Sequence, residues 1–329
     1  MRIAVDAMGG DNAPKSIVEG AMLALEEYQD IEIILVGNES EIKPFITKQS
    51  ERLRIVHTTE VIGTDEEPVK AVRGKKDSSL VQVTRMVKEQ EAEACISAGN
   101  TGAYMTAGLL VTGRIKGVER PGLSIIYPTM SGRASVILDV GANVDAKPEH
   151  LLQYAYMGSI YAEKVLGYDN PTVGLLNVGT EDNKGNELVK HAFPLLKNSS
   201  VNFVGNIEGR DVPHGVADVI VCDGFAGNVL LKVTEGVVGT IFGMLKDEFT
   251  KSTMTKLAAL ILKPGLKSFK KKMDYTEYGG APLLGLNGVC IKAHGSSNDF
   301  AIKNGIGQAR KFLQYNVNEL IQQKVQERE

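Results

Sequence analysis

The chain has 329 residues, enough to bury one large α/β core or two smaller ones, and 43% of its residues are hydrophobic. Its 37 basic and 40 acidic side chains leave a formal net charge of −3, which gives no overall attraction for nucleic acid. The three cysteines show neither metal-ligand spacing nor a disulfide framework, and no run of about 18 apolar residues predicts a membrane span.

The first elements alternate between strand and helix. Residues 3–6 are predicted to form a strand, residues 7–14 a turn, and the residues that follow a helix through Leu25. Residues 31–37 and 54–57 are predicted to be further strands. This alternation favours βαβ units in a mostly parallel sheet. The chain opens on a strand without a charged and then apolar leader, so we expect a cytoplasmic protein.

Residues 59–79 are polar and irregular, and residues 70–77 carry several positive charges. We interpret the charged run as a solvated loop, the usual role of such runs. The alternative is that it helps to hold an anionic substrate.

Residues 95–103, C-I-S-A-G-N-T-G-A, join a buried strand to a helix. Gly99 and Gly102 flank Asn100 and Thr101, and glycine lets backbone N–H groups approach a bound group closely. The N-terminus of the following helix directs free N–H groups to the same place. The pattern indicates an anion site, most often for phosphate. The alternative is a tight turn without a ligand.

Similar turns recur farther along the chain. Residues 124–128 and 134–139 are predicted to be antiparallel strands, and residues 148–166 a helix. Gly- and Asn-rich turns then follow predicted strands at 172–176 and 217–222, and a helix is predicted over residues 229–245. Turns of this kind collect at the carboxyl ends of strands, so we expect several of them to share one crevice.

Residues 251–272 contain seven lysines and no acidic residue. Helical spacing places one apolar stripe on this segment, made of Met254, Leu257, Ala258, Ile261 and Leu262. Such a helix suits an anionic membrane surface. An acidic partner protein, a dimer interface and packing on the chain's own core are the alternatives.

The remaining elements are a strand near residues 288–292, a helix from Asp299 and a charged helix from Asn316 that is expected to fray. No linker-like stretch divides the chain. We therefore predict one α/β domain over residues 1–329, with a helical excursion protruding at about residues 250–275.

The stretch that most resembles a nucleotide-binding motif departs from it at a critical position. Residues 9–16 approach a P-loop, but Pro14 replaces the second glycine and has no N–H to donate. Cys95 and Cys222 have no neighbouring histidine, which favours structural thiols over nucleophiles. If phosphate is itself the nucleophile, the site needs only donors and a cation. Candidate residues on the predicted loops are Asn100, Thr101, Lys184, Asn228 and His294.

Taken in order, the motifs resemble those of the bacterial phosphate acyltransferase family. The matching stretches are D-A-M-G-G-D (6–11), S-A-G-N-T-G-A (97–103), L-D-V-G-A-N (138–143), L-L-N-V-G-T-E-D-N-K-G-N-E (175–187), C-D-G-F-A-G-N (222–228), Y-G-G-A-P-L-L-G (278–285) and A-H-G-S-S (293–297). Together they cover nearly the whole chain.

The resemblance implies an enzyme of phospholipid synthesis that makes acyl phosphate from acyl-[acyl-carrier-protein] and inorganic phosphate. It also implies a three-layer α/β/α fold with a mostly parallel mixed sheet, similar to isocitrate and isopropylmalate dehydrogenases and to phosphotransacetylases. A homodimer and peripheral association with the inner face of the cell membrane are implied as well. No cofactor or metal is expected.

On this basis we hypothesise the roles of the candidate residues. Phosphate is expected among the backbone and side-chain donors of Gly99, Asn100, Thr101, Gly102, Gly227 and Asn228. Lys184 would offset its charge, and Asn100, Asn228 or His294 would stabilise the oxyanion of the attacked carbonyl. The competing interpretations are a metal- and NAD-dependent dehydrogenase of the related fold and a non-catalytic adaptor for membrane and carrier protein.

Overall fold

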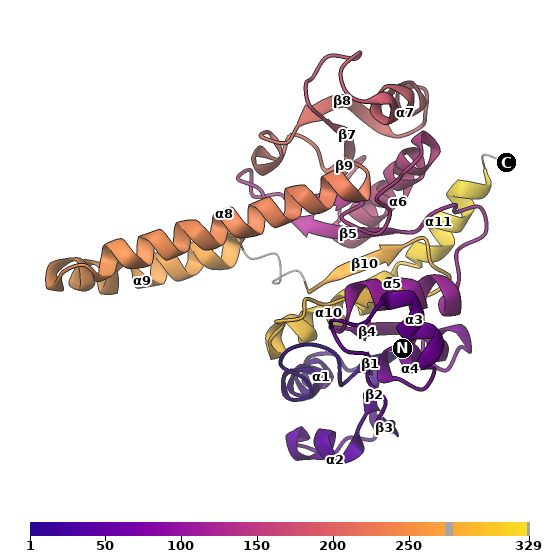
Figure 1. The fold of residues 1–329 in the computed structure, drawn as a ribbon, viewed down its shortest axis with the longest axis vertical. Coiled ribbons are helices and arrows are strands. Elements are labelled where there is room, and N and C mark those ends of the chain that lie inside the picture. The colour runs from indigo at the N-terminus through magenta and orange to yellow at the C-terminus, as the bar shows by residue number, and fades with distance from the viewer. Residues whose placement is uncertain (274–278, 328–329) are drawn as a thin grey trace.

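A computed structural model describes residues 1–273 and 279–327. Within these residues, eleven strands form one mixed sheet, flanked by helices (Figure 1). The strands are β1 (Arg2–Asp6), β2 (Glu32–Gly37), β3 (Leu53–His57), β4 (Ala94–Ser97), β5 (Gly122–Tyr127), β6 (Ser135–Leu138), β7 (Thr172–Asn177), β8 (Asn202–Glu208), β9 (Val219–Val221), β10 (Ala281–Leu284) and β11 (Val289–Lys292).

The helices lie between the strands in chain order. The α-helices are α1 (Lys15–Glu27), α2 (Glu39–Ile42), α3 (Pro68–Gly74), α4 (Ser79–Lys88), α5 (Thr101–Ala107), α6 (Pro148–Leu166), α7 (Glu187–Lys197), α8 (Gly224–Thr250), α9 (Thr253–Met273), α10 (Asp299–Gln314) and α11 (Val317–Gln326). Short helices η1 (Lys43–Phe45), η2 (Gly108–Thr112) and η3 (Val212–His214) complete the set, η2 being a π-helix.

The sheet has the order β3-β2-β1-β4-β11-β10-β5-β6-β9-β7-β8. The first five strands in this order pair in parallel, and so do the last four. Between these two groups, β10 and β5 pair antiparallel with each other and with their neighbours. The predicted antiparallel pair is therefore confirmed as β5 and β6, in a sheet that is otherwise mostly parallel.

Both faces of the sheet are covered. Successive residues of β1 enter opposite cores: Ile3 and Val5 belong to one apolar cluster, and Ala4 belongs to the other. The first cluster includes residues of α1, α6, α7, α10 and α11, and the second includes residues of α3, α4 and α5. The predicted three-layer α/β/α arrangement is confirmed.

The segment interpreted as a solvated loop contains helix α3. The interpretation of residues 70–77 was wrong because the helix start signal lies just before them. Glu67 caps the helix by accepting hydrogen bonds from the N–H groups of Val69 (3.1 Å) and Lys70 (2.9 Å), and Pro68 occupies the first turn. Lys75, one of the basic residues of this segment, forms an ion pair in which its Nζ atom lies 2.6 Å from Oε1 of Glu66.

Helix α8 begins earlier than predicted and is longer. The side chain of Asp223 caps it by accepting a hydrogen bond from the N–H of Ala226 at 2.8 Å. Gly227 lies in the first turn, where a Cβ atom would come within 1.9 Å of the backbone oxygen of Asp139. The glycines that suggested a turn therefore permit the helix to start against the end of β6.

Helices α8 and α9 form a hairpin that projects from the rest of the molecule (Figure 1). Contrary to the sequence expectation, α8 contains a window that is long and apolar enough to cross a membrane, by length and composition only. Interspersed glycines had hidden it from a search for an uninterrupted apolar run. The same helix starts in the folded core, where Gly224 and Gly227 are buried.

All five residues of the predicted apolar stripe on α9 are exposed, and Met254 is 82% exposed. A second apolar face of α9, including Ala259, Leu260 and Leu266, shares an open groove with α8. The side chains of Lys267 and residues 270–272 lie outside the described residues. Toward the C-terminus, α11 packs on α6, and Val317, Ile321 and Val325 are buried.

Candidate active site

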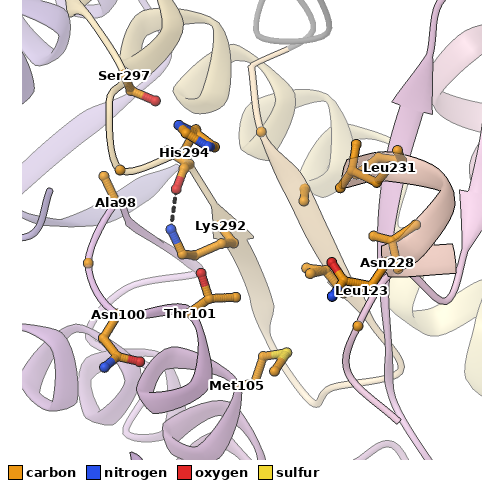
Figure 2. Close-up of a pocket in the computed structure, with 18 of the residues that line it drawn as sticks. Ala98, Asn100, Thr101, Met105, Leu123, Asn228, Leu231, Lys292, His294 and Ser297 are labelled. Carbon is orange, nitrogen blue, oxygen red and sulfur yellow. Dashed lines mark hydrogen bonds between the residues drawn. The ribbon is translucent and has the colours of Figure 1, made fainter. Parts of the chain in front are cut away.

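A cavity of about 600 Å³ opens at the base of the hairpin. Its walls come from the turns after β4, β6 and β11, from β5, from the first part of β10 and from the first turns of α8 (Figure 2). Of the predicted Gly- and Asn-rich turns, the one after β4 and the one after β9, which is the first part of α8, meet at this cavity as expected, whereas residues 178–186 after β7 are not among its described lining residues. The turn after β1 joins them through the Asp11 N–H, which donates to the Gly295 carbonyl at 2.8 Å.

The cavity has two chemically different sides. Its apolar lining consists mainly of Met105, Leu123, Ile125, Ile126, Val140 and Leu231. Its polar lining comes from the loop carrying Asn100 and Thr101 and from Lys292 and His294, whereas Asn228 of α8 lies on the opposite side, near Leu123 and Leu231 (Figure 2). In Figure 2, Lys292 lies between the loop of Ala98 and Thr101 and the loop of His294. Such a cavity suits a ligand with a charged head and an apolar tail.

The turn after β4 is anchored by a buried carboxylate. The hydroxyl of Ser97 donates to Asp6 at 2.6 Å and accepts from the N–H of Gly99 at 3.0 Å. Burial raises the pKa of Asp6, while hydrogen bonds from Ser97 and the Met8 N–H oppose the rise. The chain also packs closely here, because a Cβ on Gly9 would lie 2.7 Å from the Gly99 nitrogen. The D-A-M-G-G-D and S-A-G-N-T-G-A motifs thus form one unit.

Asn100 holds the same loop in place. Its side-chain oxygen accepts from the Ala103 N–H at 3.0 Å, and its amide donates to the carbonyls of Gly63, Thr64 and Glu66. The side chain is therefore engaged in capping α5 and fastening the preceding loop. Among the described residues, no hydrogen bond engages the backbone N–H groups of Asn100, Thr101 and Gly102, which are left for a ligand.

The sequence analysis missed Lys292. This residue ends β11, is only 6% exposed, and its ammonium donates a hydrogen bond to the Ala293 carbonyl. Burial lowers the pKa of Lys292 to about 8, and the negative charges of Asp6 and Asp11 oppose that effect. A lysine that closes an otherwise apolar strand, just before the A-H-G-S-S motif, is the signal that could have identified it.

His294 and Asn228 lie on opposite sides of the cavity (Figure 2). The Nδ1 atom of His294 accepts from the Ser296 N–H at 3.2 Å, which places the proton of a neutral ring on Nε2. Partial burial lowers the pKa of His294, which favours the neutral ring. Neutral imidazole and the Asn228 amide can each donate a hydrogen bond to a carbonyl oxygen.

The structure does not bring the remaining candidates to the cavity. Lys184 lies on the loop between β7 and α7, with its ammonium 3.8 Å from Glu181. Gly227 packs on the end of β6.

The three cysteines are free and buried, and burial raises the pKa of the Cys95 and Cys222 thiols, which is typical of structural residues. Across residues 1–273 and 279–327, no group of three or more His, Cys, Asp or Glu side chains is arranged to hold a metal ion.

The arrangement of strands and helices is that of the phosphotransacetylase fold. A phosphotransacetylase from Streptococcus pyogenes superposes with a TM-score of 0.62 at 16% identity, covering 95% of this chain and 94% of that one. A branched-chain phosphotransacylase from Enterococcus faecalis gives a TM-score of 0.61 at 14% identity, covering 96% and 99%. At this level of identity the likeness defines the fold alone.

Sequence comparison gives the family. Residues 1–320 match the family described as "Fatty acid synthesis protein". The phosphate acyltransferase of Brevibacillus brevis is 61% identical over 327 residues, covering 99% of this chain and 98% of that protein. The phosphate acyltransferase of Bacillus cereus is 59% identical over 313 residues, covering 95% and 94%. The chain belongs to the bacterial phosphate acyltransferase family, among enzymes that transfer acyl groups with phosphate.

Proposed function

We propose that this enzyme transfers an acyl group from acyl-[acyl-carrier-protein] to inorganic phosphate, and that the acyl phosphate feeds phospholipid synthesis. The observation that carries the proposal is the single cavity with an apolar side and a cationic, amide-lined side. The apolar side suits a fatty acyl chain, because burial of each CH₂ contributes about 0.8 kcal/mol. The polar side suits phosphate and the reacting carbonyl.

The reaction needs no side-chain nucleophile. A phosphate oxygen attacks the thioester carbon, a C–O bond forms, and the C–S bond breaks with its electron pair leaving on the carrier's sulfur, which then takes a proton. The carbonyl oxygen gains negative charge on the way, and either the His294 ring or the Asn228 amide, on opposite sides of the cavity, is the donor proposed to stabilise it. The amides of Asn100, Thr101 and Gly102 would orient the attacking phosphate.

Trapping with hydroxylamine tests the reaction. The purified enzyme is given acyl-carrier protein loaded with a fatty acyl group, and phosphate is varied. Hydroxylamine also cleaves thioesters directly, so a reaction without enzyme gives the background. Above that background, we expect carrier thiol and acyl hydroxamate to appear together, in equal amounts, and only when phosphate is present. A sulfate control reports whether any anion suffices. Enzyme-dependent thiol release without phosphate, or no enzyme-dependent hydroxamate at any phosphate concentration, would refute the proposal.

The hairpin supports two further proposals about location and assembly. We propose that the exposed stripe of α9 binds an anionic membrane from the cytoplasmic side, where lysines such as Lys256 and Lys263 add electrostatic attraction. We also propose a homodimer. It is supported by a second exposed apolar row on α8, at helical spacing, formed by Val229, Val233, Val237, Ile241 and Met244.

A further inference from the structure

The ammonium of Lys292 is buried beside the cavity. A lysine ammonium has three N–H donors, and among the described residues one of them is engaged, with the Ala293 carbonyl. Across the described residues, no carboxylate forms an ion pair with it, although Asp6 and Asp11 exert an electrostatic attraction. A buried charge in this state is unfavourable unless a partner of opposite charge completes its surroundings.

The cavity offers a place for an anion beside the Lys292 ammonium. Lys292 lines the cavity together with the unengaged backbone N–H groups of residues 100–102, and Thr101 lies on the cavity side of that loop (Figure 2). The Thr101 hydroxyl adds a further donor or acceptor. A small oxyanion between these groups would receive hydrogen bonds from amides, a hydroxyl and an ammonium, the set that phosphate prefers.

We propose that Lys292 binds the phosphate substrate and supplies the positive charge that was sought at Lys184. This inference rests on the proposed function for the identity of the anion. The ammonium stays protonated and transfers no proton. Asp6 is a positioning residue, because it fixes Gly99 through Ser97 and holds positive charge at Lys292 by attraction.

Binding of labelled phosphate by equilibrium dialysis, without acyl donor, tests the site directly. In Lys292→Met we expect at least a tenfold loss of phosphate affinity and a similar rise in the KM for phosphate, since a charge-assisted contact is removed. The KM for the acyl carrier should change by less than about threefold. Lys292→Arg keeps the charge and should recover part of the affinity.

Two lysine variants serve as controls. Lys184→Ala should affect phosphate affinity far less than Lys292→Met does, because Lys184 lies outside the cavity. Lys197→Met removes one positive charge from the exposed surface of α7, where Lys197 pairs with Asp182, and reports the effect of net charge alone. Circular dichroism and thermal unfolding establish that each variant is folded.

The pH dependence separates binding from a merely structural role. Asp6 and Asp11 act on Lys292 from the β1 side, and its neighbour His294 and the α8 residues Lys232 and Glu235 line the same cavity. As pH rises through about 8, Lys292 loses its charge and phosphate affinity should fall. In Lys292→Arg this loss should disappear below about pH 10, because arginine remains protonated.

The outcomes distinguish this inference from the proposed function. Wild-type phosphate affinity in a folded Lys292→Met, or equal losses for phosphate and acyl carrier, would overturn the role of Lys292 while leaving acyl transfer intact. Phosphate binding that depends on Lys292, in an enzyme that forms no acyl phosphate, would support the site and refute the proposed function.

Discussion

We expect the Lys292 side chain to affect both phosphate binding and the free energy of unfolding. Its pKa lies at about 8 in the folded protein against 10.5 for an ordinary lysine, so the folded state holds a charge that burial disfavours. Replacing it with the apolar Met should therefore raise the free energy of unfolding at pH 7, by up to roughly 3 kcal/mol. Thermal and urea unfolding measure the change. A large destabilisation of Lys292→Met would show that the ammonium is structural.

The sign of the pH effect can be worked out for the same residue. Between about pH 8 and 10.5 the unfolded chain keeps a proton that folded Lys292 has lost, so stability attributable to this group rises with pH across that window. Wild-type and Lys292→Met should therefore approach each other in stability as pH rises through that window. A constant difference over the window would contradict the burial argument.

A second prediction at the residue scale concerns two glycines of α8. Gly227→Ala places a Cβ 1.9 Å from the Asp139 backbone oxygen, so the first turn of α8 must shift, at a cost of roughly 3 kcal/mol or more. Gly236→Ala is the matched control, because nothing lies within 4 Å of its Cβ and alanine favours a helix by about 1 kcal/mol. Urea midpoints that move in the same direction for both variants would contradict this packing.

At the scale of single residues, the sequence predicted which residues lie on loops better than it predicted their chemical roles. Asn100 and His294 lie on turns after strands, as predicted, whereas Asn228 lies on helix α8 and not on the predicted turn; all three line the cavity. The sequence could not show whether Lys292 or Lys184 lies nearer to the turn after β4. That depends on the pairing of strands β4 and β11, which only the structure shows.

At the scale of elements, the bounds of a helix with clear start and stop signals were predicted accurately. The bounds of helices whose first turns contain weak helix formers were not. Helix α6 was predicted with the bounds that it has, residues 148–166, because Pro148 starts it and Gly167 ends it in a left-handed conformation. Helix α3 was missed although Glu67 and Pro68 mark its start. The beginning of α8 was missed because Gly224 and Gly227 suggested a turn, whereas Asp223 is a helix cap.

The membrane proposal is tested on α9. Met254→Glu puts a charge into the exposed stripe and should lower binding to anionic vesicles by about tenfold or more, since it removes an apolar anchor and adds repulsion. Met130→Glu is the matched control, because Met130 is 77% exposed but lies on the connection between β5 and β6 and not on α9. Vesicle co-sedimentation measures both. Equal binding by the two variants would remove α9 from the membrane contact.

The dimer proposal is tested on α8. Val237→Asp introduces a charge in the middle of the exposed valine row and should shift the protein from dimer to monomer in light scattering after size exclusion. Met254→Glu, on the other helix, tells whether the membrane and dimer surfaces are separate. A Val237→Asp protein that remains dimeric would place the interface elsewhere.

At the scale of the whole molecule, the fold class and the convergence of turns followed from the sequence, but the strand order did not. Alternating strands and helices indicated a covered, mostly parallel sheet. The position of β11 beside β4 depends on contacts between residues nearly 200 apart, such as the thiols of Cys95 and Cys290 at 3.5 Å. Local patterns carry no information on that pairing, yet it assembles the cavity.

The central claim is that one cavity lets a phosphate oxygen attack an acyl thioester. Mass spectrometry of the product formed with phosphate labelled by ¹⁸O at every oxygen tests it most directly. The account predicts an acyl phosphate that retains all the labelled oxygens, because only the C–S bond breaks and no P–O bond does. A product that has lost one label, or free fatty acid as the only product, would contradict it.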